Sequence, residues 1–562
     1  MRITIAIALL GAGFAAAQDA ASKCSGLTSV RNLPNASTVV ASAALNPSGA
    51  QPEHCEVLGR INERSGVNNQ RYAIKFHLRL PSNWNGGFFF EGGGGSNGNL
   101  GNALGNLQGQ QRGNALSLGY AVVSQDSGHD NRENNDPERN GSTTFGFDPQ
   151  ARLDFGYNSY DQVTQTAKAL IRAYYGRAPE RSYFVGCSEG GREGMMMSQR
   201  FPDYFDGILA CSPGFKLPKA ALYGHAWDAQ TLAEVAKAAG IYDRFGQPLL
   251  NKTFTDEDLD VAAQQILDAC DELDGLKDGM ILNFPACTAA VVSAKLDAAT
   301  CKGPKRVTCL SGVQVAALKK IMSGARDSKG ELLYADWPWD RGIGGKIGDN
   351  YNQGWRIWKM GAYDSPLNSA IIVGLGSGAV SAIFSTPPVA VPSSGAAPMA
   401  FLMGIDLNRD AGKIYAESGL YTKSSWDFMM ASSTDLSAYQ RRGGKLIIVH
   451  GASDPVFSIN DTIGWWNQVN QANGGRAADF VRLFAVPGMN HCSGGPATDR
   501  FDAFAALVNW VEKGAAPEKI IAAAGPVSPW PGRTRPLCPY PSQPRYNGTG
   551  NMEDAASFSC QR

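Results

Sequence analysis

The sequence predicts an α/β fold, in which helices cover both faces of a mostly parallel sheet and one large insertion interrupts the chain. Short apolar runs alternate with helical patterns from about residue 71 to 212, and again from about residue 434 onward. Strands that alternate with helices in this way form parallel sheets. Between the two regions, residues 215–432 contain many aromatic residues and the Gly, Pro and Ser-rich stretch "VGLGSGAVSAIFSTPPVAVPSSGAAP". At 562 residues the chain is too long for one ordinary core, which agrees with an insertion.

The individual elements follow from the local patterns. In the first region we expect strands in "RYAIKFHLRLP", "GGFFFEGGG", "GYAVVSQDSG" and "RSYFVGCS", and a helix in "SYDQVTQTAKALIRAYYG". In the second region we expect strands in "GGKLIIVHGASD" and "ADFVRLFAVPGMNH", and a helix in "DRFDAFAALVNWVEKG" that ends at Gly514. Residues 18–214 and 433–562 would form one domain. Residues 215–432 would either cover a site as a lid or serve only as an extra packing module.

The N-terminal residues "MRITIAIALLGAGFAAAQDA" have the pattern of a secretory signal peptide. One Arg precedes an apolar run and a stretch of small residues, and cleavage is expected after Ala17. The apolar run is too short to span a bilayer, and no other stretch reaches membrane length. A lipid anchor would need a Cys after the cleavage site, where Gln18 stands. We therefore expect residues 1–17 to be removed and the mature protein to be extracellular or periplasmic.

Charge and cysteine content exclude several classes of protein. The chain has 51 Lys and Arg against 51 Asp and Glu, so no basic surplus favours nucleic acid or an anionic membrane. Eleven cysteines without any C-x-x-C spacing indicate disulfides rather than a zinc cluster in an exported chain. The odd number leaves at least one free thiol, and Cys211 in the apolar stretch "GILACSPG" is the candidate.

A glycine-flanked serine is the candidate nucleophile. Gly186, Ser188 and Gly190 fit G-x-S-x-G, with an apolar strand before them and the helical pattern "GREGMMMSQRF" after them. This setting is the nucleophile elbow of α/β-hydrolases, in which a strained turn between strand and helix exposes the Ser hydroxyl. The alternative, a serine in an ordinary glycine turn, does not account for the strand and helix on either side.

The base and the acid follow from their order in the chain. In α/β-hydrolases the nucleophile is followed by an acid and then by a histidine. The six histidines are His54, His77, His129, His225, His450 and His491. Only His491, in the loop "VPGMNHCSGG", follows both Ser188 and the best acid, Asp454 in "VHGASDPVFS". Asp454 can orient the imidazole, although an Asp before Pro455 is also typical of a turn cap.

Two cysteines stand beside these residues. Cys187 precedes Ser188, and Cys492 follows His491. If the two cysteines bond, their Cα atoms lie about 5.5–6 Å apart, and the nucleophile and base are held within hydrogen-bonding range. In the chain-entropy model, so long a closure contributes on the order of 5 kcal/mol.

On "GCSEGGRE", "HGASDPVFS" and "PGMNHCSGG" the chain is identified as similar to the tannase and feruloyl esterase family of α/β-hydrolases. Longer stretches, such as "ARLDFGYNSYDQVTQ", "YNQGWR" and "PGMNHCSGGPATDRFD", resemble the branch of it that acts on mono(2-hydroxyethyl) terephthalate. The resemblance implies a secreted serine carboxylesterase for esters of aromatic carboxylic acids, with the triad Ser188, Asp454 and His491 and an inserted lid. It also implies the disulfides Cys187–Cys492, Cys24–Cys55, Cys270–Cys287, Cys301–Cys309 and Cys538–Cys560, which leave Cys211 free.

Acyl transfer needs hydrogen-bond donors for the oxyanion. The N–H of Glu189, at the start of the helix, is one natural donor, and the second should come from the glycine run "FFFEGGGGSNGNLGN". The resemblance implies that this second donor is Gly95. The run also fits G-x-G-x-x-G through Gly93, Gly95 and Gly98, but no crossover helix follows it, so dinucleotide binding is disfavoured.

An acidic turn is the candidate metal site. "CDELDGLKDGM" places Asp271, Asp274 and Asp278 within eight residues. Such carboxylates repel one another unless a hard cation such as Ca²⁺ joins them, although a solvated Asp-Gly turn is the alternative. The resemblance implies a structural calcium ion in the lid, with carbonyl ligands from Leu276 and Met280, and no organic cofactor.

The resemblance also implies an aromatic substrate pocket. Trp358 would stack on the ring, and Phe457 and Leu217 would supply apolar contacts, although such residues usually serve core packing. In the terephthalate branch an Arg holds the free carboxylate, whereas Ile372 stands at this place and Gly376 replaces an aromatic residue. Because Ile supplies neither charge nor planar hydrogen bonding, mono-esters with a free carboxylate should be poor substrates.

Neutral esters should therefore be preferred, such as bis(2-hydroxyethyl) terephthalate or alkyl hydroxycinnamates and gallates. The expected partner is a small aromatic ester bound by a monomer, without nucleic acid or membrane. Two alternatives remain open at this stage. One is a feruloyl esterase or tannase that acts on plant phenolic esters, and the other is a non-catalytic exported binding protein on a hydrolase scaffold.

Overall fold

A computed structural model describes residues 19–109, 113–344 and 353–562, and the expected signal peptide, residues 1–17, lies outside them. Nine strands form one sheet in the order β1-β2-β3-β5-β4-β6-β7-β8-β9. They are β1 Val39–Asn46, β2 His54–Ser65, β3 Arg71–Pro81, β4 Gly87–Glu91, β5 Ala121–Gln125, β6 Arg181–Cys187, β7 Gly207–Cys211, β8 Lys445–Gly451 and β9 Val481–Val486. The pairings from β5 to β9 are parallel, and those among β1, β2, β3 and β5 are antiparallel.

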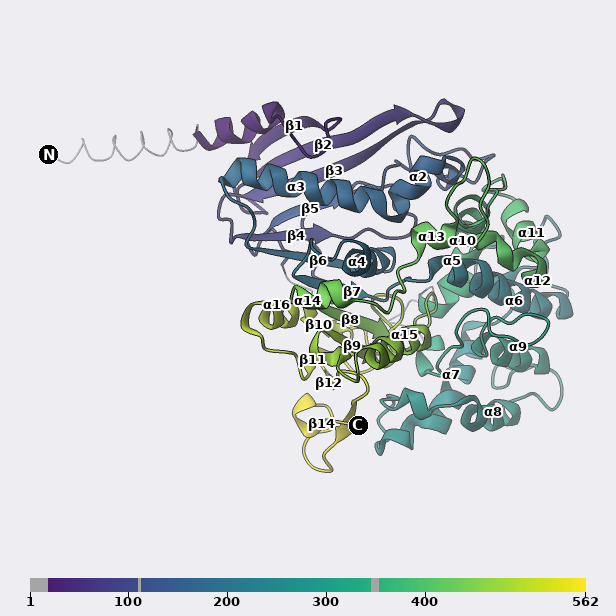
Figure 1. Ribbon diagram of the computed structural model, residues 1–562. Helices are drawn as coiled ribbons and strands as arrows, with labels where there is room; N and C mark the ends of the chain where they lie inside the picture. The colour runs from purple at the N-terminus through teal and green to yellow at the C-terminus, as the bar shows by residue number, and fades with distance from the viewer. Residues whose placement is uncertain (1–18, 110–112, 345–352) are drawn as a thin grey trace.

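Both faces of the sheet are covered by helices (Figure 1). Phe88 and Phe90 of β4 lie in a core formed with α3 (Ser159–Tyr175), α4 (Glu189–Arg200) and α15 (Ile459–Ala472). Phe89, between them, belongs to the opposite core, which α16 (Ala503–Lys513) covers. This alternation follows the two-residue period of a strand. Buried on both sides, the central strands consist of continuous apolar runs, as expected of a parallel sheet.

The elements predicted from local patterns are all present. The strand expected in "RYAIKFHLRLP" is β3, Arg71–Pro81. The long helix α3 ends at Tyr175, where Gly176 takes a left-handed conformation with φ 77°, and α16 ends in the same way before Gly514 with φ 69°.

Some elements carry too little signal in the sequence to be predicted. β1, at the edge of the sheet, alternates between partly buried and exposed residues, β2 beside it alternates between buried and more exposed residues, and β7 is a buried run of only five residues. Near the C-terminus two further sheets form, which were not predicted either. They consist of β10 Arg500–Phe501, β11 Ile520–Ala523 and β12 Thr534–Leu537, and of β13 Gln543–Tyr546 and β14 Phe558–Gln561.

Residues 212–444, here called the insertion, connect β7 to β8 and contribute no strand among their described residues. Its helices are α5 Leu217–Lys219, α6 Ala226–Ala238, α7 Asp256–Cys270, α8 Ala289–Ala298, α9 Gly312–Met322, α10 Ile371–Gly378, α11 Ala397–Gly404, α12 Leu407–Asp410, α13 Ser425–Met429 and α14 Ser437–Arg441. Figure 1 shows most of them gathered beside the sheet. They share one core with Phe145, Phe155 and Phe457 from outside the insertion, so the two parts of the chain are packed together. Within the described ranges, no helix has the length and apolar character needed to cross a bilayer.

Candidate active site

The backbone at Ser188 forms a strained turn between β6 and α4. Ser188 has φ 64° and ψ −119°, a conformation that residues with a side chain rarely adopt. A Cβ at Gly186 would lie 2.6 Å from the carbonyl group of Gly190, and a Cβ at Gly190 would lie 2.6 Å from the carbonyl oxygen of Gly93. The glycines of the G-x-S-x-G pattern are therefore required by close backbone packing, and the turn presents the Ser188 hydroxyl at the end of the strand.

Three predicted residues meet at this turn. His491 Nε2 lies 2.8 Å from Ser188 Oγ, and His491 Nδ1 lies 2.8 Å from Asp454 Oδ2. A carboxylate only accepts hydrogen bonds, so Nδ1 carries the proton and Nε2 accepts the hydroxyl proton of Ser188. Asp454 follows β8, and His491 follows β9. The arrangement is that of a nucleophile, a base and an orienting acid.

Asp454 is fully enclosed and strongly hydrogen-bonded. Its Oδ1 accepts the N–H groups of Val456 at 2.8 Å and Phe457 at 3.1 Å. Burial by itself would raise the pKa of Asp454, but the charges and hydrogen bonds of His491 and His450 outweigh burial and hold that pKa well below its usual range. Asp454 therefore remains ionised and can stabilise the imidazolium of His491.

His450 contacts the acid Asp454, although its place in the chain excluded it as the base itself. Its Nε2 is 3.3 Å from Asp454 Oδ2 and 3.0 Å from the carbonyl oxygen of Phe457, and its Nδ1 is 2.9 Å from Thr462 Oγ1. Two acceptors face Nε2, so this nitrogen carries the proton. The sequence analysis did not assign His450 this supporting contact; the signal available was its place four residues before Asp454.

The cysteines pair as the resemblance implied. Cys187 and Cys492 form a disulfide with a Cα–Cα distance of 6.0 Å. The other four are Cys24–Cys55, Cys270–Cys287, Cys301–Cys309 and Cys538–Cys560. Cys211 is free and buried, and burial raises its pKa to about 12, so it is an inert thiol.

The two expected oxyanion donors both border the same cavity as Ser188. Glu189 is the first residue of α4, and the first N–H groups of a helix have no acceptor within it. Gly95 has φ 62°, and its N–H has no hydrogen-bond acceptor among the described residues. Residues 92–98, here called the oxyanion loop, pack on α4, where the N–H of Gly190 donates to the carbonyl oxygen of Gly93 at 3.1 Å.

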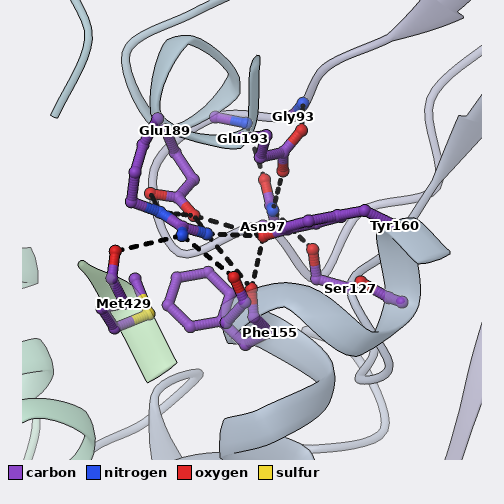
Figure 2. A network of polar contacts seen from close by, with 12 residues as sticks. Gly93, Asn97, Ser127, Phe155, Tyr160, Glu189, Glu193 and Met429 are labelled. Carbon is purple, nitrogen blue, oxygen red and sulfur yellow. Dashed lines mark hydrogen bonds and ion pairs between the residues drawn. The ribbon is translucent and has the colours of Figure 1, made fainter. Parts of the chain in front are cut away.

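The oxyanion loop is also held by a buried carboxylate (Figure 2). Glu193 Oε2 accepts the N–H of Gly93 at 3.0 Å, and Glu193 Oε1 accepts from Asn97 Nδ2 at 2.8 Å. Asn97 Oδ1 in turn accepts the N–H of Gly94 at 2.7 Å. Burial, with the nearby charge of Glu189, raises the pKa of Glu193 to about 7. The sequence analysis did not single out Glu193, which the motif "EGGREG" places four residues after Glu189.

The side chain of Glu189 is engaged away from the cavity. It forms an ion pair with Arg192, and both side chains are buried. Arg192 also donates to the carbonyl oxygen of Gly156 at 2.9 Å and to the Tyr160 hydroxyl at 2.7 Å, and it reaches the carbonyl oxygen of Met429 at 3.3 Å. Only the backbone N–H of Glu189 is therefore available to a ligand beside Ser188.

The cavity beside Ser188 encloses, with its mouth, about 520 Å³. It is lined by Gly95, Ser96, Phe155, Ser188, Glu189, Leu217, Ala221, His225, Trp358, Ile371, Leu375, Gly376, Ala379, Phe384, Val456 and Phe457. Three predicted pocket residues, Leu217, Trp358 and Phe457, are thus on its wall. The Trp358 and Phe457 rings both meet the His491 ring edge-on, with centroid distances of 5.3 and 5.5 Å.

Ile372 differs from its predicted position. It is fully buried in the core of the insertion and is not one of the lining residues. Ile371, Leu375 and Gly376 border the cavity instead, and Ile371 and Leu375, four residues apart, share one face of α10. No Lys or Arg is among the lining residues that the structure describes.

His225 is a cavity residue that the sequence analysis passed over. It is 6% exposed. The Val456 backbone lies near enough to act on its pKa, but neither ring nitrogen has a partner of good hydrogen-bond geometry among the described residues. It ends a π-helical turn, Ala220–His225, a geometry often found at functional sites. Burial, together with the charges of Lys359 and His491, lowers the pKa of His225 to about 3, so the imidazole is neutral.

The acidic turn has its carboxylates bound mainly to backbone N–H groups. Asp271 accepts from Gly279, Asp274 accepts from Leu276 and Leu282, and Asp278 accepts from Met280 and from Arg535. Burial, with smaller effects of the charges of Asp278 and Asp271, raises the pKa of Asp274 to about 7. Among the residues that the structure describes, no group of three or more His, Cys, Asp or Glu side chains is arranged as a metal-binding cluster.

Comparisons with known proteins agree with this geometry. The profile of the family described as tannase and feruloyl esterase matches residues 55–561. The chain is 50% identical over 547 residues to a mono(2-hydroxyethyl) terephthalate hydrolase from Piscinibacter sakaiensis, which covers 94% of this chain and 89% of that protein. It is 29% identical to a probable feruloyl esterase from Arthroderma benhamiae, over 92% of this chain and 88% of that protein.

Among solved structures, feruloyl esterase B from Aspergillus oryzae superimposes with a TM-score of 0.72 at 22% identity, over 96% of this chain and 100% of that chain. At this identity the likeness shows a shared fold. The predicted fold class, an α/β-hydrolase with helices on both faces of a mixed sheet, is confirmed.

Removal of the Cys187–Cys492 disulfide should reduce both stability and turnover. The double variant Cys187→Ala/Cys492→Ala loses a cross-link between residues 305 apart in sequence, and we expect the free energy of unfolding to fall by about 2–5 kcal/mol. We also expect kcat for an ester to fall by about tenfold or more, because Ser188 and His491 are no longer held in register. Urea denaturation and ester kinetics measure the two effects.

The matched control is Cys301→Ala/Cys309→Ala, which opens a loop of sequence separation 8 within the insertion. This variant should leave kcat unchanged. An unaltered kcat in the Cys187/Cys492 variant would show that the disulfide does not position the triad.

Proposed function

The chain belongs to the tannase and feruloyl esterase family, and on that premise we propose that it is an exported serine carboxylesterase for esters of aromatic carboxylic acids. The observation that carries the proposal is the hydrogen-bonded path from Ser188 Oγ through His491 to Asp454, at 2.8 Å for each step, beside an apolar cavity. A binding protein on the same scaffold would have no use for a nucleophile in a strained turn or for an oriented base.

The reaction proceeds in two steps. His491 Nε2 takes the hydroxyl proton as Ser188 Oγ bonds to the ester carbonyl carbon, and the N–H groups of Gly95 and Glu189 stabilise the oxyanion. The bond from the acyl carbon to the alcohol oxygen then breaks, and His491 gives its proton to the leaving alcohol. Water next gives a proton to His491 Nε2 as its oxygen bonds to the acyl carbon. The bond from that carbon to Ser188 Oγ then breaks, and His491 gives the proton to Ser188 Oγ, which releases the acid and restores the hydroxyl.

The cavity favours an uncharged aromatic group. Trp358 and Phe457 can contact a ring, and Ile371 and Leu375 extend an apolar wall from α10. A free carboxylate would lose its hydration without a cation to replace it, which is costly. Mono(2-hydroxyethyl) terephthalate, named for the relative from Piscinibacter sakaiensis, should therefore be a poorer substrate here than its neutral diester.

His225 favours hydroxylated rings, such as hydroxycinnamates and gallates, as a second candidate within the same class. A neutral imidazole has one donor and one acceptor, and a phenolic hydroxyl can satisfy either. A buried polar group left without a partner costs free energy, so a substrate hydroxyl on His225 would improve kcat/KM.

We further propose that residues 18–214 and 433–562 form the hydrolase domain and that residues 215–432 act as its lid. The lid interpretation is supported by Leu217, Trp358 and α10, which come from the insertion and face the nucleophile across the cavity. Export of a monomer after removal of residues 1–17 is supported by five disulfides, which persist in oxidising compartments.

A structural calcium ion on the acidic turn is part of the proposal. The available ligands are all oxygen atoms, from the side chains of Asp271, Asp274 and Asp278 and the carbonyl groups of Leu276 and Met280, which is the donor type that Ca²⁺ takes. Asp271 and Asp274 are paired with no cation in the described residues and are the ligands best placed for the ion, whereas Asp278 is paired with Arg533 and Arg535 and would have to turn away from them. The ion would stabilise the insertion and take no part in ester chemistry.

A substrate panel tests the esterase proposal. We expect kcat/KM for bis(2-hydroxyethyl) terephthalate to exceed that for mono(2-hydroxyethyl) terephthalate by about tenfold or more, because only the mono-ester buries a charge. Product release measured by chromatography gives the rates. Ser188→Ala is the control and should abolish turnover of every ester, and full turnover in that variant would overturn the serine mechanism.

His225→Phe tests the preference for hydroxylated rings. The variant keeps a planar ring but loses both nitrogens, so kcat/KM for methyl p-coumarate should fall by about tenfold. Methyl cinnamate, which lacks the hydroxyl, should be hydrolysed at an unchanged or higher rate and serves as the matched control. An equal loss on both esters would assign His225 to packing instead.

Calcium should stabilise the protein without changing catalysis. At a free calcium concentration a hundredfold above Kd, the free energy of unfolding should rise by about 2.7 kcal/mol, and a chelator should reverse the effect. Asp274→Asn should remove the response, and kcat below the unfolding transition should be the same with and without the ion. Thermal unfolding that does not respond to calcium or chelator would exclude the site.

A further inference from the structure

Glu193 stands out among the buried carboxylates because both of its oxygens bond to the oxyanion loop. The Gly93 N–H and the Asn97 amide donate to its two oxygens, and Asn97 passes the restraint on to Gly94. Glu193 is 0% exposed, and neither oxygen is among the buried polar atoms without a partner. Figure 2 shows the carboxylate between α4 and the loop.

The hydrogen bonds that hold the oxyanion loop end at Gly94, one residue before the expected oxyanion donor Gly95. Gly93 and Gly94 are each fixed through their N–H groups, whereas Gly95, next along the chain, keeps a free N–H at the cavity. A Cβ at Gly94 or Gly95 would contact nothing within 4 Å, so no side chain of the protein presses on these two residues from that direction. The place of the Gly95 N–H therefore depends on these anchors together with the backbone contact between Gly190 and Gly93.

The same helix carries the nucleophile. Ser188 immediately precedes α4, and Glu193 lies on its second turn, on the face that contacts the loop through Gly190. A carboxylate on this helix fixes the distance from the Gly95 N–H to Ser188 Oγ, which oxyanion stabilisation requires. We infer that Glu193 is a positioning residue, whose ionised carboxylate holds the oxyanion loop in register with Ser188. This inference rests on the proposed esterase function.

The charge state of Glu193 matters because both carboxylate oxygens must accept. Protonation turns one oxygen into a hydroxyl, which is a weaker acceptor than a carboxylate oxygen, so the anchor at Gly93 or at Asn97 is weakened. The groups around the carboxylate are Glu189 and Arg192 on its own helix, Tyr160 on α3 and Asn97 on the loop. Glu189 and burial raise the pKa of Glu193 to about 7, and Arg192 and the two hydrogen bonds oppose them.

Because the pKa of Glu193 is raised in the folded protein, the free energy of unfolding depends on pH through this residue. The protonated carboxyl contributes stability that is fully present below the ordinary glutamate value of about 4.5, and that contribution is lost as pH rises through about 7. Folding thus favours the protonated form, whereas the positioning role needs the ionised form. Activity and stability should respond to pH in opposite directions at this residue.

The variant Glu193→Gln tests the effect of Glu193 on activity separately from its effect on stability. The variant keeps the shape but presents an amide donor to one of two N–H groups, so kcat should fall by about 10- to 100-fold, with KM little changed. In the wild type, protonation of Glu193 adds to the loss of activity at low pH, so the acid limb of log kcat against pH should be steeper in the wild type than in Glu193→Gln. The unfolding free energy of the wild type should decline relative to that of the variant from pH 5 to 8.

Glu91→Gln is the matched control. Glu91, the last residue of β4, accepts the N–H groups of Asn106 at 3.1 Å and Gly105 at 3.4 Å, and so holds a different loop. This control should keep the wild-type pH profile. The inference would be overturned if Glu193→Gln kept the wild-type kcat. It would also be overturned if Glu193→Gln and Glu91→Gln showed the same decrease in kcat and the same pH dependence.

Asn97→Gly gives a second route that does not alter the carboxylate. Asn97 has φ 56°, which glycine adopts without strain, and the change removes one hydrogen bond that lowers the pKa of Glu193. The acid limb should move to higher pH, and an unmoved limb would count against the inference. Persistent turnover in Ser188→Ala would instead overturn the proposed function itself, so the two failures are distinguishable.

Discussion

The site depends on the close contact between two backbone segments, the turn at Ser188 and the oxyanion loop. Gly186, Gly190 and Gly92 lie so near one another that a Cβ on any of them would meet another of the three unless the backbone shifted. This contact places the strained Ser188, the start of α4 and the loop in one rigid unit at the end of β6. The N–H of Gly190 on the carbonyl oxygen of Gly93 joins the two segments directly. The base, the acid and the cavity wall are then added to this unit from later parts of the chain, as is usual when loops on a rigid sheet carry chemistry.

The rigid unit requires charged side chains of α4 to be buried. Glu189, Arg192 and Glu193 are all enclosed, although removing charges from water is unfavourable. The Glu189–Arg192 pair is compensated by further hydrogen bonds to carbonyl oxygens, and these link α4 to Phe155, Gly156 and the insertion at Met429. Burial raises the pKa of Glu189 despite this pair, and burial with the charge of Glu189 raises that of Glu193, whereas the charges and hydrogen bonds of His491 and His450 lower the pKa of Asp454. The buried charged side chains of α4 thus fix the positions of neighbouring segments, although their burial does not add to the stability of the fold.

Local patterns and the paired motifs predicted what depends on neighbours in sequence. β3, the end of α3 at Gly176 and the candidate residues Ser188, Asp454 and His491 all follow from spacing, turn chemistry or chain order. The strands β1 and β2 were missed because a half-exposed edge strand lacks a clear apolar run. Glu193, His225 and His450 could not be assigned, since their contacts span up to a hundred residues or depend on which way a turn faces. Ile372 was likewise placed by resemblance in the segment that forms α10, but the resemblance did not show which residues of the helix face the cavity. Neighbouring residues on a helix point about a quarter turn or more apart, so Ile371 borders the cavity while Ile372 does not.

The charges of the insertion explain why the cavity is apolar. Lys359 follows Trp358 directly, yet its ammonium group is buried, paired with Asp228 and placed over the rings of Trp337 and Trp355. Arg356, on the same π-helical segment, pairs with Asp256. Lys359 and Arg356 are therefore already paired, and a substrate carboxylate would have to compete with Asp228 or Asp256 for them. Breaking a buried pair by removing one partner costs several kcal/mol. The proposed preference for neutral esters thus rests on where these two cations are bound as well as on the residues of α10.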